Sequence, residues 1–470
     1  MDEGANRREV LRGAAGLTLA SALPVLAACG DGALVPPAQA ATRPNILFIM
    51  GDDLGYADVS CYGRRDYLTP AIDGLAAGGV RLTNGYANSC VCSPTRIGLV
   101  TGRYQQRLPV GLEEPITTPS PLDMLPPGHP TLPSLLKGLG YRTALIGKWH
   151  IGSTPTSGPN NYGYDHFFGY TGGGINYYQQ SGGTPASQFP DDLSRNGTPA
   201  GWDGYLTDAL AEEAMRWIAG GSAPFFLSLH FSAGHAPWVG PGDTAAAAAW
   251  NDPLDRNHGD LETYSRMIMN MDANIGRVLE ALAASEIASN TIVVFTSDNG
   301  GERFSETWPF TGVKGEVLEG GLRVPLIVRW PGRIAPGTLS DQVMISMDFL
   351  PTLLAAVGGA PDPAFPSDGM NLMPVLAGAE PIVARTLFWR HRAGEQAAVR
   401  DGNWKYVRLG AEEHLFDLAA DARERADRAG DEPSRLAELR GAWDRWNASM
   451  LPYPPNSFSY DVKDVDADRY

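Results

Sequence analysis

The stretch Asn45-Ile46-Leu47-Phe48-Ile49-Met50, which runs into Gly51-Asp52-Asp53, is the clearest indication of the fold in this chain. The five consecutive apolar residues, Ile46–Met50, suit a strand that is buried on both faces of a parallel sheet. Similar runs occur at residues 142–146, 225–229 and 291–296. Longer amphipathic stretches separate these runs, and we expect helices at residues 70–77, 129–138, 205–218 and 261–284. The alternation predicts an α/β fold, with a large, mostly parallel or mixed sheet between layers of helices.

A smaller unit is expected after Pro361–Pro366, where proline and glycine interrupt the alternation. Short β-like runs and then a helix-like stretch follow, at residues 386–389, 397–399, 404–407 and 433–446. They predict a small C-terminal antiparallel sheet with one closing helix. We expect the acidic end, residues 461–470, to be a solvated tail.

The composition restricts the partners of the protein. The chain has 470 residues, and its 37 lysines and arginines against 53 aspartates and glutamates give a formal net charge of −16. Binding to nucleic acid or to an anionic membrane surface depends on clustered positive charge, so the composition argues against both. An anionic substrate would need a local positive site. Four cysteines are too few for a disulfide framework at this length.

Residues 1–42 have the order of parts of an export signal. Arg7 and Arg8 precede an apolar stretch at residues 14–28 that is too short to span a bilayer. This order fits twin-arginine export to a periplasm or cell surface. Two processing sites remain open: residues 26–29 resemble a lipobox with a lipid anchor on Cys29, whereas cleavage after Ala40 would release a free protein. We therefore divide the chain into an export signal and linker, a main α/β domain and a smaller α+β subdomain, at residues 1–42, 43–365 and 366–470.

Polar side chains gather where two of the expected strands end. Asp52 and Asp53 follow the first apolar run, and Asp298 and Asn299 follow the run at 291–296. Ligands bind outside the carboxyl edge of an open parallel sheet. Adjacent carboxylates repel each other unless a cation neutralises them, and oxygen ligands suit Ca²⁺ or Mg²⁺. Each pair alone is also common turn chemistry, but together they predict one divalent cation at this edge.

Residues 86–103, YANSCVCSPTRIGLVTGR, add a candidate nucleophile. Pro94 suits the first turn of a helix, which would place Cys92 at the positive N-terminal end, where a thiolate or a bound anion is favoured. Cys90 and Cys61 are expected to be small, partly or fully buried residues and not nucleophiles.

Lys148 and His150 follow the apolar run at 142–146 and are two positions apart, so an extended backbone would point both to one side. Lys148 would carry a fixed charge, and His150 can move a proton near neutral pH. Lys148 and Lys314 are two of only five lysines in the chain. His235 is the second candidate histidine. Surface or core positions are expected for His129, His166, His230, His258 and His414.

These segments resemble the type I, formylglycine-dependent sulfatases of the alkaline phosphatase superfamily. Cys92-Ser93-Pro94-Thr95-Arg96 is similar to the pattern in which the cysteine is converted to formylglycine. Thr95 stands where the family most often has serine, and it keeps the hydroxyl. The resemblance extends in the family's order through Asp52-Asp53, Gly147–His150, His235–Pro237, Asp298-Asn299, Lys314 and Glu319–Gly321. It implies an alkaline-phosphatase-like fold and hydrolysis of sulfate monoesters.

The resemblance also implies a role for each matched residue. The implied metal ligands are Asp52, Asp53, Asp298, Asn299 and the modified Cys92. Lys148 and Lys314 would bind the sulfuryl group, and His235 or Lys314 would protonate the departing alcohol or phenol. His150 would take a proton from the formylglycine hydrate so that sulfate is expelled, and Arg96 would hold the formylglycine. A formylglycine-generating maturation enzyme and the twin-arginine translocase are the implied partners.

Two other functions remain open at this point. A phosphate or phosphonate ester hydrolase of the same superfamily would share the metal clusters, but a second cation would need more histidine and aspartate ligands than we can place. A non-catalytic binding protein would keep Cys92 unmodified.

The substrate is either an aryl sulfate or the end of a sulfated saccharide, because the acidic composition disfavours long polyanions. Residues 171–178 and 308–310 supply aromatic loops suited to a sugar ring or an arene. Asn176 in the first loop is a candidate substrate contact. His391 is a second candidate, from the C-terminal unit, with a purely structural role as its alternative.

Overall fold

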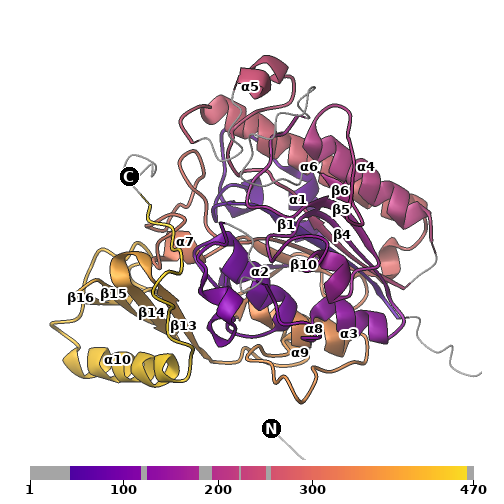
Figure 1. Cartoon of the computed structure of the whole chain (residues 1–470). Helices are drawn as coiled ribbons and strands as arrows, with labels where there is room; N and C mark the ends of the chain where they lie inside the picture. Colours follow the sequence, from indigo (N-terminus) through magenta and orange to yellow (C-terminus); the bar gives the residue numbers. More distant parts are fainter. Residues whose placement is uncertain (1–42, 118–123, 179–192, 222–223, 250–255, 463–470) are drawn as a thin grey trace, which may run out of the picture. The chain divides into compact units, whose positions relative to one another are not determined.

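A sheet of ten strands forms the centre of the fold. This computed structural model describes residues 43–117, 124–178, 193–221, 224–249 and 256–462 (Figure 1). The strands are β1 (Asn45–Gly51), β2 (Val80–Leu82), β4 (Arg142–Lys148), β5 (His166–Tyr170), β6 (Ser194–Arg195), β7 (Thr198–Pro199), β8 (Phe225–His230), β9 (Thr291–Ser297), β10 (Leu326–Arg329) and β11 (Thr338–Ser340). Their order is β11-β2-β10-β9-β1-β8-β4-β5-β6-β7.

The five central strands, from β9 to β5, are parallel, whereas β10 is antiparallel to both of its neighbours. The sheet is therefore mixed, which confirms the expected fold class. All residues of β1, β8 and β9 are buried, as their continuous apolar sequences predict. The four predicted runs are real strands that extend one or two residues further than expected. These extra residues include Lys148 and His230.

Helices cover both faces of this sheet (Figure 1). One layer contains α1 (Pro70–Ala77), α4 (Leu206–Ala219) and α6 (Leu261–Ala284), and the other contains α2 (Cys92–Thr101), α3 (Leu132–Gly138) and α8 (Phe349–Ala356). Successive side chains of β1 point alternately toward the two layers of helices. Leu47 and Ile49 pack in the core on the α4 and α6 side, and Ile46 and Phe48 pack in the core on the α3 and α8 side. The short helices are α5 (Thr244–Ala249), α7 (Glu319–Leu322) and α9 (Met373–Leu376).

The expected helix at 129–138 begins later than predicted. Thr131 is its N-cap, and the Thr131 side chain accepts a hydrogen bond from the backbone N–H of Ser134 while the Ser134 side chain bonds back to Thr131. This capping box sets the start of α3 at Leu132. The sequence prediction placed the start at His129 because it gave no weight to the cap.

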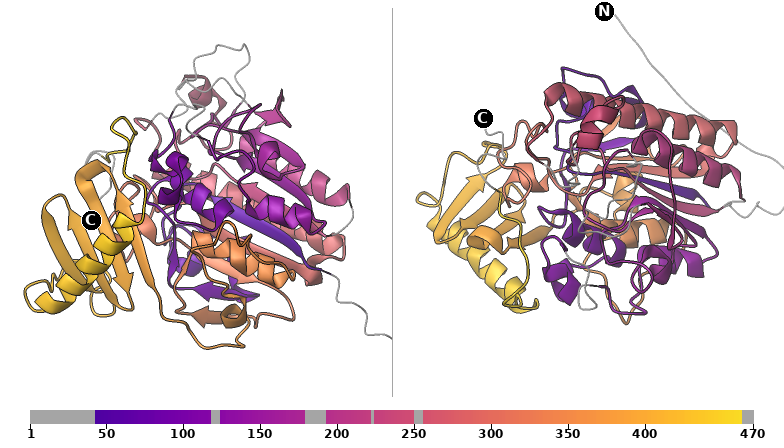
Figure 2. Two further views of the ribbon diagram at one scale, coloured as in Figure 1. Left: turned by 60° about the horizontal axis from the view of Figure 1, so that its bottom comes forward. Right: turned by 45° about the horizontal axis from the view of Figure 1, so that its top comes forward.

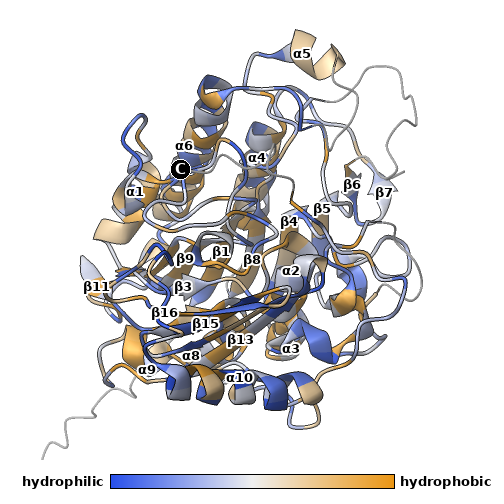
Figure 3. Ribbon diagram, turned by 90° about the vertical axis from the view of Figure 1, so that its left-hand side faces the viewer, coloured by the Kyte–Doolittle hydropathy of each residue, from blue (hydrophilic) through white to orange (hydrophobic). Residues whose placement is uncertain are grey.

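The C-terminal region forms the expected antiparallel sheet, from β13 (Thr386–His391), β14 (Gln396–Asp401), β15 (Trp404–Leu409) and β16 (Glu412–Asp417). Helix α10 (Pro433–Ala448) lies across it (Figure 2). Figure 3 shows α10 as a mostly hydrophilic helix, and it is anchored through the buried side chains of Leu439, Trp443 and Trp446. A separate two-stranded sheet pairs β3 (Gly85–Tyr86) with β12 (Met344–Ile345).

The boundary at residues 365 and 366 stays a prediction. Residues 43–462 belong to one compact unit, and Leu372 and Leu376 pack in the core beneath the large sheet. The export signal and most of the acidic tail lie outside the described residues. Within the described part of the chain, every helix is too short or too polar to cross a bilayer.

Candidate active site

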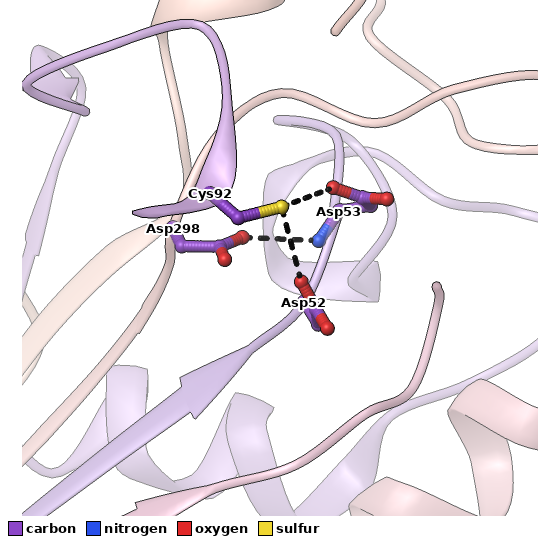
Figure 4. Close-up of side chains that lie close together, drawn as sticks. All are labelled: Asp52, Asp53, Cys92 and Asp298. Atoms are coloured by element: carbon purple, nitrogen blue, oxygen red, sulfur yellow. Dashed lines mark hydrogen bonds between the residues drawn. The ribbon is translucent and has the colours of Figure 1, made fainter. Parts of the chain in front are cut away.

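The carboxyl ends of β1 and β9 bring Asp52, Asp53 and Asp298 together with Cys92. One potential ligand atom from each of these four residues lies within 4.8 Å of the other three. The Cys92 Sγ atom is 3.8 Å from the nearer oxygens of both Asp52 and Asp53 (Figure 4). The parallel pairing of the two strands aligns Met50 with Thr296 and Gly51 with Ser297, so the polar residues that follow each strand emerge side by side. The predicted clustering at this sheet edge is confirmed.

Cys92 is the first residue of helix α2, as the position of Pro94 predicted. The hydroxyl of Thr95 accepts from the backbone N–H of Ser89 and donates to the Ser89 carbonyl, which fixes the loop before the helix. Burial raises the pKa of the Cys92 thiol well above its usual range, and the nearby Lys148 and Lys314 do not offset it. An unmodified Cys92 would be a poor nucleophile.

Each carboxylate of the cluster has a cationic partner. Lys148 donates to both oxygens of Asp52 at 2.9 and 2.7 Å, and Lys314 donates to Asp53 at 2.6 Å. Arg96 donates to one oxygen of Asp298 through Nε at 3.0 Å and through Nη2 at 2.7 Å. All six side chains are buried. The three carboxylates and three cations cancel formally, so a bound divalent cation would make the site positive and attractive to an anion.

The residues at this edge fit a hard divalent cation. Asn299 donates through Nδ2 to Asp53 and to the Gly300 carbonyl, whereas its Oδ1 is buried without a hydrogen-bond partner. Burial also raises the pKa of the Asp52 carboxyl well above its usual range, and the neighbouring carboxylates add to this. A cation between the carboxylates would relieve that repulsion and give the Asn299 oxygen a partner. Asp52, Asp53, Asp298 and Asn299 therefore fit a cation, and the predicted set of five ligands, which also includes the modified Cys92, stays a prediction.

Strand β4 delivers Lys148, and the chain then turns sharply to place His150. Gly147 has φ of 110°, and a Cβ atom there would lie 1.7 Å from the His230 carbonyl oxygen, so only glycine fits between the strands. His150 itself has φ of 60°, an uncommon value for a residue with a side chain. Its Nε2 lies 2.9 Å from the Ile116 carbonyl, which requires a proton on Nε2 and leaves the buried Nδ1 without a partner. Burial lowers the pKa of His150 well below its usual range, so the ring is neutral with one lone pair available.

His235 lies beside Asp53, with its Nε2 3.7 Å from Oδ2 of that carboxylate. The Nδ1 of His235 donates to the carbonyl of Ala236, and burial lowers the pKa of the ring. Tyr177 is fully buried and donates to the carbonyls of Ser232 and His235. The loop at 171–178 therefore holds the backbone of the His235 loop in place. No local sequence pattern indicated this role for Tyr177.

Two further residues that the sequence analysis did not select belong to the site. Glu302 lies 3.8 Å from the Lys314 ammonium and is paired with Arg256. His230, at the end of β8, lies 3.3 Å from the Arg96 guanidinium and 3.2 Å from the Lys148 carbonyl. A polar residue at the end of a buried strand was the available indication for His230, and nothing in the local sequence indicated Glu302.

The two candidate substrate contacts, Asn176 and His391, form their hydrogen bonds with residues outside the four-residue cluster. Asn176 donates to the Ala247 carbonyl at 3.1 Å and accepts from the backbone N–H of Tyr178. His391 is buried, with its ring nitrogens 3.1 Å from Glu114 and 2.8 Å from the Tyr460 carbonyl. The structure therefore does not join either residue directly to the four-residue cluster, and their roles toward substrate stay predictions.

Comparisons with known proteins agree with this site. Residues 44–360 match the Sulfatase family model, and residues 314–438 match the model described as N-sulphoglucosamine sulphohydrolase, C-terminal. Arylsulfatase A of Homo sapiens is 33% identical over 408 residues, which cover 79% of this chain and 76% of the relative. N-acetylgalactosamine-6-sulfatase of Canis lupus familiaris is 31% identical over 412 residues, which cover 81% and 74%.

A solved structure extends this similarity to three dimensions. The crystal structure of Ps i-CgsB aligns with a TM-score of 0.80 at 30% identity and covers 89% of this chain and 95% of that chain. The same protein has been solved in complex with k-i-k-neocarrahexaose. With the matched family model spanning more than half of the sequence, the chain belongs to the sulfatase family and is a sulfuric ester hydrolase.

Proposed function

We propose that this sulfatase removes the sulfate group from the end of a sulfated saccharide, using a formylglycine made from Cys92 and one divalent cation. The observation that carries the proposal is the burial of the reacting group: Cys92 is 1% exposed, and the surrounding aspartates are fully buried. A terminal sulfate ester would reach a buried group more readily than the interior of a long polyanion would. Similarity to N-acetylgalactosamine-6-sulfatase and to a protein solved with a neocarrahexaose supports a sugar, and similarity to arylsulfatase A keeps an aryl sulfate as the alternative.

The proposed modification of Cys92 rests on the resemblance of residues 92–96 to the formylglycine pattern, and the burial of the thiol supports it. Burial raises the pKa of Cys92, so the unmodified residue is a weak nucleophile at neutral pH. A hydrated formylglycine would supply one hydroxyl to attack sulfur and a second hydroxyl whose deprotonation releases the sulfate.

The cation would be held by oxygen atoms of Asp52, Asp53, Asp298 and Asn299. Oxygen-only donors favour Ca²⁺, with Mg²⁺ as the alternative. When bound, the cation would lower the pKa of a neighbouring hydroxyl and add positive charge for the sulfate. The unpartnered Oδ1 of Asn299 supports a cation at this position.

The remaining residues divide into charge carriers and proton carriers. Lys148 and Lys314, which pair with Asp52 and Asp53, would stabilise negative charge on the sulfuryl oxygens. His150 would accept a proton at Nδ1, because its Nε2 proton is committed to Ile116. Lys314 or His235 would protonate the leaving oxygen. Arg96, held by Asp298 at the first turn of α2, would position residue 92.

We also propose export by the twin-arginine route to the periplasm or cell surface, with a lipid anchor on Cys29 or cleavage after Ala40. Arg7 and Arg8 before the apolar stretch support this route. A cytoplasmic maturation enzyme would then modify Cys92 before the folded protein is exported.

Peptide mass spectrometry of protein from its native host tests the modification directly. The peptide that contains Cys92 should carry the mass of an aldehyde side chain, and the new N-terminus should begin at Cys29 or after Ala40. A panel of sulfated monosaccharides, an aryl sulfate and an aryl phosphate then tests the ester class. An unmodified thiol in fully active protein would contradict formylglycine as the nucleophile. Faster turnover of the aryl phosphate than of the sulfate esters would contradict the assignment of a sulfate ester as the substrate.

A further inference from the structure

A second polar cavity, of about 310 Å³, lies in the C-terminal region. It is bounded by strands β13 and β15, helix α10 and the segment that follows this helix. Three arginines line it, and Glu395 is the single carboxylate among the lining residues. None of these residues belongs to the catalytic cluster.

The register of the small sheet places two of the arginines that line the cavity on the same face of the sheet. Arg390 pairs with Ala397, and Ala397 pairs with Arg408, so the three side chains lie in one row across β13, β14 and β15. Residues in register on neighbouring strands share a face of the sheet. Ala397 contributes only a methyl group to this row, and Trp443 of α10 lines the cavity together with Arg390 and Arg408.

Aromatic rings hold the two guanidinium groups in place. The guanidinium of Arg408 lies over the ring of Trp443 at 4.6 Å, and that of Arg390 lies over the ring of Tyr453 at 4.4 Å. A guanidinium stacked on a ring keeps its N–H groups free in the plane for an acceptor. Because the arginines occupy the ring faces, the cavity suits a charged group better than a stacked sugar ring.

The hydrogen bonding of these arginines is incomplete. The Nε atoms of Arg390 and Arg408 are buried and have no acceptor. Arg390 uses its terminal nitrogens on Asn447 and the Leu451 carbonyl, and it is only 7% exposed. The side chain of Arg408 makes no hydrogen bond or ion pair with any residue that the structure describes. Buried N–H donors of a charged group that lack an acceptor are costly, so a bound anion would stabilise them.

Neighbouring carboxylates do not neutralise this row. Glu413 is in register with Arg408, but it accepts from Tyr406 and pairs with Arg440. Arg392 donates to the carbonyls of Pro454, Pro455 and Ser457, which are uncharged. Among the described residues, no carboxylate forms an ion pair with the side chain of Arg390, Arg392 or Arg408, and the buried Glu114 accepts only from the backbone N–H of Arg392. This is a local positive site in a chain with a net charge of −16.

We propose that this arginine pocket binds a sulfate oxyanion at a position separate from the catalytic centre. Arg408 and Arg390 would donate to its oxygens, and Trp443 and Tyr453 would keep the two guanidinium groups in place. The sulfate is either a free ion, such as the product, or a second sulfate group on a saccharide. The inference does not depend on which ester the catalytic site hydrolyses, because the pocket shares none of its residues.

Selenate, an anomalous scatterer with the shape of sulfate, locates the site. Crystals soaked in sodium selenate should show an anomalous peak between Arg390 and Arg408, and crystals of R408Q should lose it. Titration calorimetry with sodium sulfate at constant ionic strength should show two classes of site in wild type. In R408Q one class should weaken by roughly tenfold to a hundredfold, the scale for loss of a charged hydrogen bond.

Matched variants make the result specific. R445Q removes the same charge from an exposed position on α10 and should bind sulfate like wild type. R408K keeps the charge without the planar fork and should bind with intermediate affinity. Thermal unfolding in chloride checks that each variant is folded. No peak in the pocket at saturating selenate, or equal weakening by R408Q and R445Q, would overturn the proposal.

Kinetics separate the two sources of sulfate. The ratio of KM for R408Q to KM for wild type is measured with a disulfated saccharide and with an aryl monosulfate. A larger ratio for the saccharide assigns the pocket to a second sulfate of the substrate. Equal ratios together with lost selenate binding assign it to the free ion.

Discussion

Lys148 donates a hydrogen bond to each carboxylate oxygen of Asp52, at 2.9 and 2.7 Å, and neither side chain is exposed to solvent. The two residues are at the ends of β4 and β1, with β8 between these strands. The ion pair therefore joins two separate strands at the same edge of the sheet. It leaves Asp52 facing Cys92 with its charge already partly compensated, before any substrate enters.

Replacement of Lys148 by methionine should destabilise the protein. The variant keeps most of the side-chain volume but removes the hydrogen-bonded cation of the buried Asp52, which then has only Arg96 Nη2, 3.7 Å away, as a cationic neighbour. We expect a loss of about 3–5 kcal/mol in the free energy of unfolding, the scale for breaking one side of a buried pair. Urea unfolding measures this loss. The double variant D52N/K148M should recover part of the stability while activity stays lost, and a stable K148M would contradict the argument.

Removal of the divalent cation should lower both stability and activity. A ligand that binds only the folded state at 100 times its Kd adds about 2.7 kcal/mol, so chelation by EGTA or EDTA should lower Tm. Adding Ca²⁺ or Mg²⁺ back should restore it. N299A removes the unpartnered oxygen and should weaken cation binding by roughly tenfold or more. A correspondingly higher cation concentration should then be needed to reach the same Tm. N456A, at an exposed asparagine, is the matched control. A Tm independent of chelator would exclude a resident cation.

Substitution of Cys92 by serine should abolish multiple turnover. Serine offers one hydroxyl and no second proton whose loss would expel the sulfate. We expect a loss of roughly 10³-fold or more in kcat, as for removal of a covalent nucleophile. The measurement is steady-state hydrolysis of an aryl sulfate, with C61S as the control because Cys61 lies outside the cluster. Normal multiple turnover by C92S would refute the formylglycine mechanism.

Much of this site could be predicted because its residues follow strong local patterns. The apolar runs fixed β1 and β9, and the polar residues directly after them had to meet at one edge once the strands paired in parallel. Pro94 fixed the start of α2 at Cys92. Gly147 marks the one position where β4 passes too close to the His230 carbonyl for any side chain.

The contacts that could not be predicted join residues far apart in the chain. Strand β10 was missed because Leu326–Arg329 is a short apolar run between prolines, and its pairing with β2 depends on tertiary structure. Tyr177 beneath His235 and Glu114 beside His391 are single polar residues whose partners have no fixed spacing. The burial that raises the pKa of Cys92 comes from the whole fold, and it outweighs the helix-end effect that local sequence suggested.

His230 should make the protein sensitive to acid. Burial lowers the pKa of His230 to about 3, with Arg96 adding to the effect, whereas an unfolded chain has a histidine pKa near 6.5. Between these values the unfolded state binds a proton that the folded state does not, so stability is full above pH 6.5 and falls as the pH drops. The slope from this one residue is about 1.4 kcal/mol per pH unit. H230N should show a shallower fall in urea-derived stability from pH 6 to 4.5, while H258N, at an exposed position, should follow wild type. Parallel curves for H230N and wild type would contradict this.

His391 and Glu114 should be coupled in stability. Their nitrogen and oxygen lie 3.1 Å apart, both side chains are fully buried, and Glu114 also accepts from Tyr453 and from the backbone of Arg392. H391N leaves Glu114 without its cation, and we expect a cost of about 3–5 kcal/mol. In a double-mutant cycle, H391N and E114Q should show a coupling of about 1 kcal/mol or more, whereas the partly exposed Glu413 and Arg440 pair should show less. A residue that only contacts substrate would instead raise KM without lowering the free energy of unfolding. The two measurements together therefore distinguish a structural role of His391 from the substrate contact that its position near the end of β13 first suggested.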